Sequence, residues 1–105
     1  MRSKLNILQG KIILDASKLH DYMQLVFEEG IGLNVYNDFC IHPGDEKKLQ
    51  TLKHKKLLSV EEMPTEIVLL LSDDVQLVID MRDSAYNGPE ALELTRQGEP
   101  TIVWN

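Results

Sequence analysis

The chain aligns with itself, without a gap, at an offset of 44 residues. Residues 8–36 (LQGKIILDASKLHDYMQLVFEEGIGLNVY) lie over residues 52–80 (LKHKKLLSVEEMPTEIVLLLSDDVQLVID). Identical residues occupy five aligned positions: Leu8/Leu52, Lys11/Lys55, Leu14/Leu58, Leu25/Leu69 and Leu33/Leu77. Repeats of this length are typical of a supersecondary unit used twice, because one copy alone cannot bury its apolar face. The repeat therefore predicts a duplicated unit that shares one core.

Each copy contains two segments with alternating apolar residues, 23–27 and 31–35 in the first copy and 67–71 and 75–79 in the second. Period two places such residues on one face of a sheet. If Phe27 pairs with Ile31, the first copy keeps all its alternating residues on one face and leaves a three-residue loop ending at Gly30. A two-residue loop would turn Ile31 to the opposite face. In the second copy Asp74 takes the left-handed position, which Asp tolerates. We therefore predict two three-residue hairpins.

The remaining segments predict further strands around these hairpins. A strand is expected before each hairpin, at residues 6–14 and 53–60, with polar connectors at 15–20 and 61–64, where Pro64 favours a break. Residues 38–51 link the copies and are expected to hold one helical turn after Gly44. Alternation of Leu92 and Leu94 with residues 102–104 predicts a final hairpin. The second copy is also apolar on its opposite face, so its hairpin strands are expected to be central or covered on both sides.

These elements predict one all-β domain over residues 1–105, either a β-sandwich or a strongly bent antiparallel sheet of about eight strands. Two three-stranded repeats, at about 6–37 and 52–83, are separated by the linker at 38–51 and followed by a C-terminal hairpin at 90–104. The apolar fraction of 43% and the charged fraction of 27% are ordinary for a globular domain and argue against disorder.

The sequence also indicates a cytoplasmic setting. The lone Cys40 cannot form an intramolecular disulfide, which fits a reducing compartment. No apolar stretch of signal-peptide length follows the N-terminal basic pair. The longest wholly apolar run, residues 67–71, is far shorter than the ~20 residues that span a bilayer. We therefore expect no membrane segment.

The net charge of −6 is distributed unevenly along the chain. Up to residue 56 there are nine Lys and Arg and seven Asp and Glu, a net charge of +2, whereas the remainder has two against ten, a net charge of −8. An acidic half repels nucleic acid and membrane surfaces and attracts basic partners. The lysines at 47, 48, 53, 55 and 56 lack interleaved aromatic residues, so we interpret them as a solvated loop and strand edge.

Candidate catalytic and metal-binding groups are few. Cys40 and His42 lie two residues apart, so a strand would place both on one face, but nucleophilic catalysis also needs an activated thiol and an oriented base. The three histidines lack zinc-site spacing, and the aspartates of residues 73–83 lack EF-hand spacing. No phosphate loop, GxSxG or HExxH motif is present. We expect no enzyme activity, no metal and no cofactor.

One stretch resembles a known group of proteins. The ending YNGPEAL…IVWN (residues 86–92 and 102–105), after a doubled Gly-Lys-apolar strand and hairpin unit, resembles small bacterial β-proteins. Some of these are immunity proteins of contact-dependent growth inhibition and related polymorphic toxin systems. The second copy departs from the first with His54 in place of Gly10 and Asp74 in place of Gly30. The resemblance implies a cytoplasmic protein without catalysis that binds one cognate toxin domain.

The charge argument agrees with that implication. Such toxins are often nucleases, whose active sites are electropositive because they hold phosphates. An acidic partner is attracted to such a site and blocks it. We therefore predict a one-to-one complex with a basic toxin domain and no direct contact with nucleic acid or membrane. The predicted partner-binding residues are Glu61, Glu62, Glu66, Asp73, Asp74, Asp80, Asp83 and Tyr86. The alternative hypothesis is a β-module with a regulatory role or a small-molecule cleft between the repeats.

Overall fold

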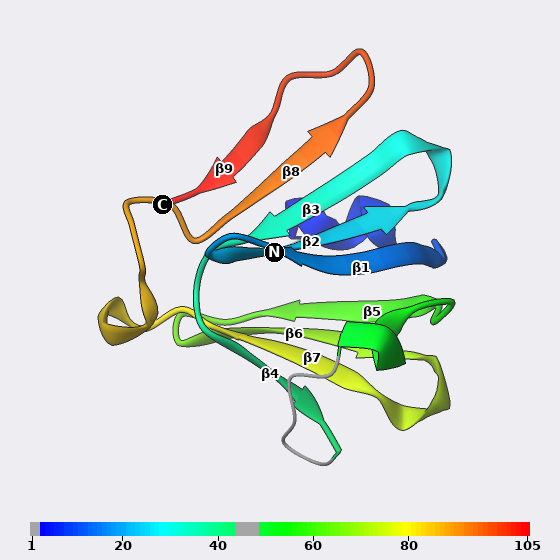
Figure 1. Ribbon diagram of the computed structural model, residues 1–105, viewed down its shortest axis with the longest axis horizontal. Coiled ribbons are helices and arrows are strands. Elements are labelled where there is room, and N and C mark those ends of the chain that lie inside the picture. The colour runs from blue at the N-terminus through cyan, green and yellow to red at the C-terminus, as the bar shows by residue number, and fades with distance from the viewer. Residues whose placement is uncertain (1–2, 44–48) are drawn as a thin grey trace.

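The computed structural model describes residues 3–43 and 49–105, which form nine strands in two antiparallel sheets (Figure 1). The five-stranded sheet has the order β1 (Ile13–Leu19), β2 (Tyr22–Phe27), β3 (Ile31–Val35), β8 (Leu92–Arg96), β9 (Ile102–Trp104). The four-stranded sheet has the order β4 (Phe39–His42), β7 (Gln76–Asp80), β6 (Glu66–Leu71), β5 (Leu57–Glu62). The predicted all-β sandwich is confirmed. The strand beyond the expected eight is β4, which forms within the predicted linker.

Both central hairpins have the predicted register. Phe27 pairs with Ile31 in the first copy, and Leu69 pairs with Leu77 in the second. The loops are single 3-10 turns, η2 (Glu28–Gly30) and η4 (Ser72–Asp74). Gly30 and Asp74 have positive φ, as predicted. The residue before each of them is also left-handed, with φ of 66° at Glu29 and 63° at Asp73, a feature that the loop length alone did not indicate.

The two copies are related by a local two-fold axis. The backbone N–H of Gly10 donates to the carbonyl of Leu57 (2.8 Å), and the N–H of His54 donates to the carbonyl of Ile13 (2.7 Å). Adding 44 to Gly10 gives His54, and subtracting 44 from Leu57 gives Ile13, so the two-fold axis relates each of these hydrogen bonds to the other. Ile12 and Lys56, also 44 apart, form an antiparallel bridge with each other. The duplicated unit therefore pairs with its own copy at the edges of β1 and β5.

The inner faces of the two sheets share one hydrophobic core. Six side chains of β2 and β6 are fully buried in it: Met23, Leu25, Phe27, Ile67, Leu69 and Leu71. Each contributes roughly 1.5–3 kcal/mol of stability through removal from water. The short helix η1 (Lys4–Leu8) adds Leu5 and Leu8 and contacts β5, whereas η3 (Leu49–Leu52) adds Leu52 and contacts β1. Each copy therefore closes the core beside a strand of the other copy.

The first strand of each repeat lies later in the chain than predicted. Residues 4–8 form η1, and the strand expected at 6–14 is β1, which continues through the expected connector at 15–20. In the second copy the strand expected at 53–60 is β5, which includes Glu61 and Glu62. Gly10 and His54 have positive φ and turn the chain before these strands. The register also shifts after Ile13 and after Leu57, so no simple alternation marks these strands.

The linker contains strand β4, and the C-terminal segment forms the predicted hairpin. Strand β4 pairs with β7, and residues 44–48, where the predicted helical turn begins, lie outside the described residues. The C-terminal hairpin pairs Leu92 with Trp104 and Leu94 with Ile102, as its alternation predicted. Trp104 is partly buried and packs against the core.

The strands of the second hairpin, β6 and β7, are central in their sheet, as predicted. Their outward side chains Val68, Leu70 and Val78 are only half-buried. The expectation is that these strands are either central or covered on both sides, and their central position satisfies it. The three outward side chains form an apolar strip on the outer face of β6 and β7 that is partly accessible to solvent.

Candidate functional site

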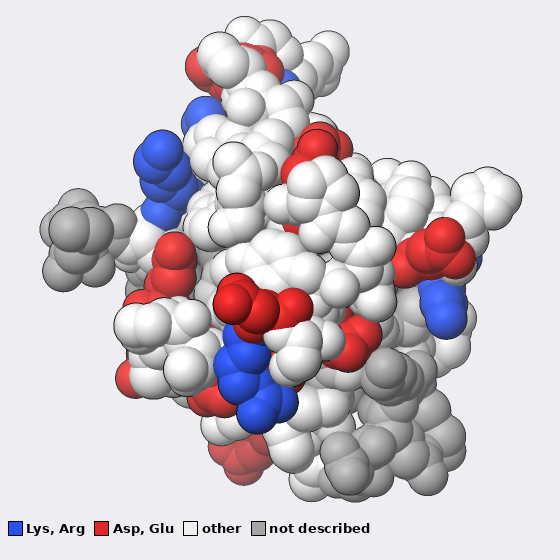
Figure 2. Space-filling model, turned by 90° about the vertical axis from the view of Figure 1, so that its left-hand side faces the viewer, with Lys and Arg blue, Asp and Glu red and all other residues white. Residues whose placement is uncertain are grey.

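Eight of the fifteen carboxylates in the described residues lie at one end of the sandwich, the left-hand end in Figure 1. The β1–β2, β3–β4 and β5–β6 connections, the loop after β7 and the end of β9 all meet there. We call this region the acidic end and define it by eight carboxylates: Asp21, Asp38, Glu61, Glu62, Glu66, Asp80, Asp83 and Glu90. Its basic residues are Lys4, Lys18 and Arg82. Figure 2 shows this side, with red carboxylates spread over it and few blue groups.

The structure separates the predicted contact residues into two groups. Six of the eight lie at the acidic end: Glu61, Glu62, Glu66, Asp80, Asp83 and Tyr86. Asp73 and Asp74 lie in η4, at the other end of β6. A six-residue strand at ~3.3 Å per residue separates η4 from Glu66 by roughly 20 Å. Glu66 and Asp74 nevertheless line one hollow on the outer face of β6 and β7, so one contact of ordinary size can reach both groups. The acidic end is the stronger candidate because it holds six of the eight predicted residues.

Asp80 is held by its neighbour Arg82. The Arg82 guanidinium donates from Nη2 to Oδ2 of Asp80 (2.6 Å) and from Nε to Oδ1 (3.0 Å), and the backbone N–H of Arg82 also donates to Oδ1 (2.9 Å). These side-chain and backbone hydrogen bonds from Arg82 hold the pKa of Asp80 below its ordinary value. Asp80 is therefore ionised over a wide pH range, and Arg82 offsets part of its charge.

Asn37 fixes the crossover between the two sheets. Its side chain is 2% exposed, and Nδ2 donates to the carbonyl of Asp80 (2.8 Å). The backbone N–H of Asp80 in turn donates to the carbonyl of Asp38 (2.9 Å). Asn87 continues the connection, because its Nδ2 donates to the carbonyl of Tyr36 (2.9 Å) and to Oδ1 of Asp38 (3.2 Å). This network sets the backbone from which Asp38 and Asp80 project.

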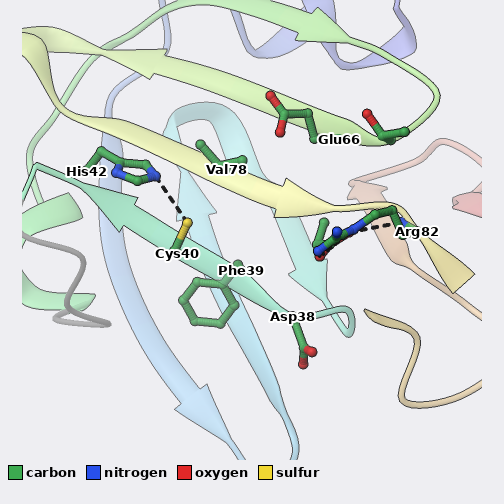
Figure 3. Close-up of a pocket in the computed structure, with 9 residues that line it drawn as sticks. Asp38, Phe39, Cys40, His42, Glu66, Val78 and Arg82 are labelled. Atoms are coloured by element: carbon green, nitrogen blue, oxygen red, sulfur yellow. Dashed lines mark hydrogen bonds and ion pairs between the residues drawn. The ribbon is translucent and has the colours of Figure 1, made fainter. Parts of the chain in front are cut away.

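A hollow of about 630 Å³ lies over β4, β7 and β6 and opens at the acidic end (Figure 3). It extends from His42 to Arg82, with Val78 between Phe39 on one side and Glu66 on the other. Three carboxylates line it: Asp38, Glu66 and Asp80. A neighbouring hollow shares His42, Glu66 and Val78 and continues over the apolar strip. An apolar floor with a carboxylate rim suits a surface that mixes basic and apolar side chains.

Cys40 and His42 lie on one face of β4, as their spacing predicted. The Cys40 Sγ and His42 Nε2 atoms are 3.2 Å apart (Figure 3). Among the described residues, no carboxylate forms a hydrogen bond with the His42 ring to orient it as a base. The same part of the chain contains no cluster of three or more His, Cys, Asp or Glu side chains placed to hold a metal ion. The pair alone therefore does not define a catalytic or metal centre.

The other predicted residues have different surroundings. Glu62 joins three elements, since it accepts from Ser3 Oγ (2.5 Å) and from Trp104 Nε1 (3.2 Å). Glu61 is exposed on β5, and Asp83 is exposed at the start of η5 (Asp83–Ala85). Tyr86, predicted as an exposed contact, is partly buried and packs against the core. Among the eight carboxylates of this end, described side chains donate hydrogen bonds to Asp38, Glu62 and Asp80. Glu61 and Glu66 are two of the remaining five and both lie on strands.

Two tyrosines at the acidic end were not among the predicted contacts. The rings of Tyr22 and Tyr36 lie with centroids 5.1 Å apart and planes tilted by 49°. They line a second hollow, of about 420 Å³, together with Asp21 and Glu90. The signal was present in the sequence, because the hairpin register that pairs Met23 with Val35 places Tyr22 opposite Tyr36.

The basic residues predicted to be a solvated loop and edge lie near the opposite end. Lys55 pairs with Asp73 (2.8 Å), and Lys53 lies 3.7 Å from Asp15. Lys47 and Lys48 fall outside the described residues. Lys11, the residue equivalent to Lys55, pairs in the same way with Glu29 (3.0 Å). Lys55 and Lys11 therefore each neutralise a hairpin-turn carboxylate, whereas Lys53 lies beside Asp15 of β1.

No protein-family model, curated protein or solved structure matches the chain. Within the described residues no helix is long and apolar enough to cross a membrane. Function therefore has to be argued from the chemistry of the acidic end and of the sheet face beside it.

Proposed function

We propose that the chain is an immunity protein that binds and neutralises a cognate toxin domain in the cytoplasm. The toxin is a basic domain, of the kind that a nuclease uses to hold phosphates. In this proposal the protein has no catalysis of its own and acts by covering a surface of the toxin in a one-to-one complex.

The observation that carries this proposal is the segregation of charge. The eight carboxylates of the acidic end share it with only three basic residues, whereas lysines at the opposite end pair with hairpin-turn carboxylates. A field of one sign increases the rate of association with a basic partner and disfavours acidic ones. The half-buried apolar strip of β6 and β7 next to this end supplies surface whose further burial would stabilise a complex.

The size of the surface agrees with this role. A stable complex buries about 800 Å² on each partner. The described structure exposes 6241 Å², so such a contact needs roughly an eighth of the surface. The acidic end and the two hollows over β4, β7 and β6 are contiguous and share Glu66, which allows one partner to cover them together.

The proposed function predicts that the gene immediately upstream encodes a large secreted protein, and the experiment expresses the chain together with the C-terminal domain of that protein. Cells that produce the toxin domain are expected to survive only when the chain is present. The purified pair is expected to form a one-to-one complex whose association rate falls as salt is raised. Absence of protection would contradict the proposed function.

Two matched variants test which end binds. Glu61→Gln with Glu66→Gln removes two charges from the acidic end, and Glu29→Gln with Asp73→Asn removes two from the hairpin turns η2 and η4, at residues that line neither of the two hollows over β4, β7 and β6. The first pair is expected to lower the association rate roughly tenfold at low salt, and the second less than twofold. Equal decreases in the association rate of the two double variants would show that binding does not depend on the acidic end.

A further inference from the structure

The hollow beside Tyr22 and Tyr36 has a composition that the proposed function does not explain. The two tyrosines are half-buried, and the tilt between their rings leaves an open angle and not a stacked pair. The hollow has a volume of about 420 Å³, enough for one large side chain of a partner. Its remaining wall is the Gly88–Pro89 turn of the YNGPE segment, which the duplicated unit does not contain. This segment therefore completes a notch at the end of the first hairpin.

The wall of the notch is anchored to the strands below it. Asn87 donates from Nδ2 to the carbonyl of Tyr36 (2.9 Å), so the turn follows the end of β3. The backbone N–H groups of Tyr36 and Asn37 both donate to the carbonyl of Ala91 (2.8 and 3.1 Å). Hydrogen bonds on both sides of Pro89 hold the turn against the tyrosines. The notch is therefore formed before any partner arrives.

Charged groups around the notch are mainly carboxylates. Asp21 and Glu90 line it, and the Tyr36 hydroxyl lies 3.5 Å from Oε1 of Glu93. Burial, with a smaller effect from Glu93, raises the pKa of Tyr36, so the ring stays neutral and keeps its hydroxyl proton at physiological pH. His20 completes the lining. An anion would meet these carboxylates at close range, whereas a cation would be attracted by them.

The faces of aromatic rings also attract cations. A cation within about 6 Å of a tyrosine centroid is stabilised by the negative face of the ring, and nearby carboxylates add to this attraction. Two tyrosine rings 5.1 Å apart allow one cation to contact both. Aliphatic stems of Lys and Arg pack well on the same rings. The chemistry of the notch therefore selects an organic cation over an anion or a neutral group of equal size.

We propose that the notch formed by Tyr22, Tyr36, Asp21 and Glu90 binds an organic cation, the ammonium or guanidinium of a Lys or Arg side chain carried by a protein partner. This identification of the partner rests on the proposed function, but binding of the cation does not. On the toxin domain, such a side chain would enter the notch while the acidic end contacts the surrounding basic surface.

The test uses the whole chain with 13C-labelled tyrosine and no toxin. The probes are the amides of N-acetyl-arginine and α-N-acetyl-lysine, the amide of N-acetyl-citrulline as a neutral match, and tetramethylammonium. The chain has three tyrosines, and Tyr86 lies outside the notch, so its signal is the internal control. We expect saturable shifts at Tyr22 and Tyr36 with dissociation constants of about 10 mM for the cationic amides. Citrulline amide is expected to cause no saturable shift.

Variants separate the aromatic contribution from the carboxylate contribution. Tyr22→Phe keeps the ring and is expected to bind as the parent does, whereas Tyr22→Leu is expected to weaken binding about fivefold. Asp21→Asn with Glu90→Gln is expected to weaken it by a similar factor, while Asp73→Asn with Asp74→Asn leaves it unchanged. If Tyr22→Leu fails to fold, the variant with Asp21→Asn and Glu90→Gln tests whether the notch binds the cation.

Three results would overturn the proposal. They are the absence of saturable shifts at Tyr22 and Tyr36, equal binding of citrulline amide, and binding of tetramethylammonium tenfold tighter than either amide, which would assign the notch to a free quaternary ammonium. A notch that binds the amides in a chain that gives no protection against toxin would leave the cation site standing and remove the proposed function. Protection against the toxin without binding of any probe would remove the cation site and leave the proposed function standing.

Discussion

Replacing Asn37 tests the crossover that positions the acidic end. The side chain is 2% exposed and donates from Nδ2 to the carbonyl of Asp80 at 2.8 Å. Asn37→Ala removes this donor and leaves a poorly solvated carbonyl, a loss that is typically 1–3 kcal/mol. We expect a decrease in unfolding free energy of about 2 kcal/mol, which for a domain of this size lowers the melting temperature by roughly 8–16 °C.

Asn37→Asp makes the same test dependent on pH. A protonated Asp can still donate to the Asp80 carbonyl, whereas an ionised one places a buried charge beside an acceptor, so burial raises its folded-state pKa above the unfolded value of about 3.9. A raised folded pKa contributes stability below the unfolded pKa, and that stability is lost as pH rises through the folded pKa. We therefore expect the variant to be near the parent at pH 4 and up to about 4 kcal/mol less stable at pH 7.

Urea unfolding of the parent and both variants, followed by tryptophan fluorescence at pH 4 and pH 7, measures these differences. The chain has one tryptophan, Trp104, which packs against the core. An equal deficit of Asn37→Asp at both pH values would refute the reasoning, because an exposed or unpaired side chain at 37 would have no such pH dependence. A deficit of Asn37→Ala below about 0.5 kcal/mol would refute it as well, since surface substitutions fall in that range.

Arg82→Met removes the hydrogen bonds that lower the pKa of Asp80, so NMR titration should show that pKa rising towards its ordinary value. A lowered folded pKa contributes stability above the unfolded pKa and loses it as pH falls through the folded one, so the small deficit of this variant is expected at pH 7 and not near pH 2. Gly32→Ala places a Cβ 2.7 Å from Thr95 Oγ1 and should lower the unfolding free energy by about 1 kcal/mol. Adding Thr95→Ala should restore most of that loss, and a double variant no more stable than Gly32→Ala would contradict this account.

The hairpins could be predicted because two constraints agree there. Alternation assigns each apolar residue to a face, and only a three-residue loop keeps Phe27 opposite Ile31 on the buried side. The additional left-handed residue of each loop, Glu29 or Asp73, escaped prediction, because the three-residue loop was expected to need only one left-handed residue, Gly30 or Asp74. Many residues together determine the register of a hairpin, whereas the φ angle at one loop position depends on how that turn closes.

The first strand of each copy could not be placed from sequence for a physical reason. Leu14 and Leu58 are identical in the two copies, yet 47% and 44% of their surface is exposed. Both lie at the register shifts that follow Ile13 and Leu57, where an extra residue turns the strand. An apolar residue at a bulge breaks the alternation from which strands are predicted, so the strand was expected several residues too early.

The acidic charge of the candidate site could be predicted from the sequence, but its position at one end of the sandwich could not. An acidic second half was evident, and turn residues gather at sheet ends, but consecutive antiparallel turns alternate between two ends. Asp73 and Asp74 lie in a turn of one end and Glu66 and Asp80 beside turns of the other. The contact between Tyr22 and Tyr36 depends on the register of β2 against β3 and not on either residue alone.

The duplication relates the tyrosine pair of the notch to a pair of carboxylates of the acidic end. Adding 44 to Tyr22 and Tyr36 gives Glu66 and Asp80, and each pair occupies the equivalent cross-strand position at the same end of its hairpin. One copy therefore carries an aromatic pair where the other carries a carboxylate pair, and each pair lines a hollow at the acidic end. Aromatic faces and carboxylates both attract cations, the first with a preference for flat or alkylated ones and the second without. Divergence at these two positions gives the two copies of the unit different side chains at equivalent places of the acidic end, so a partner that contacted both places would distinguish one copy from the other.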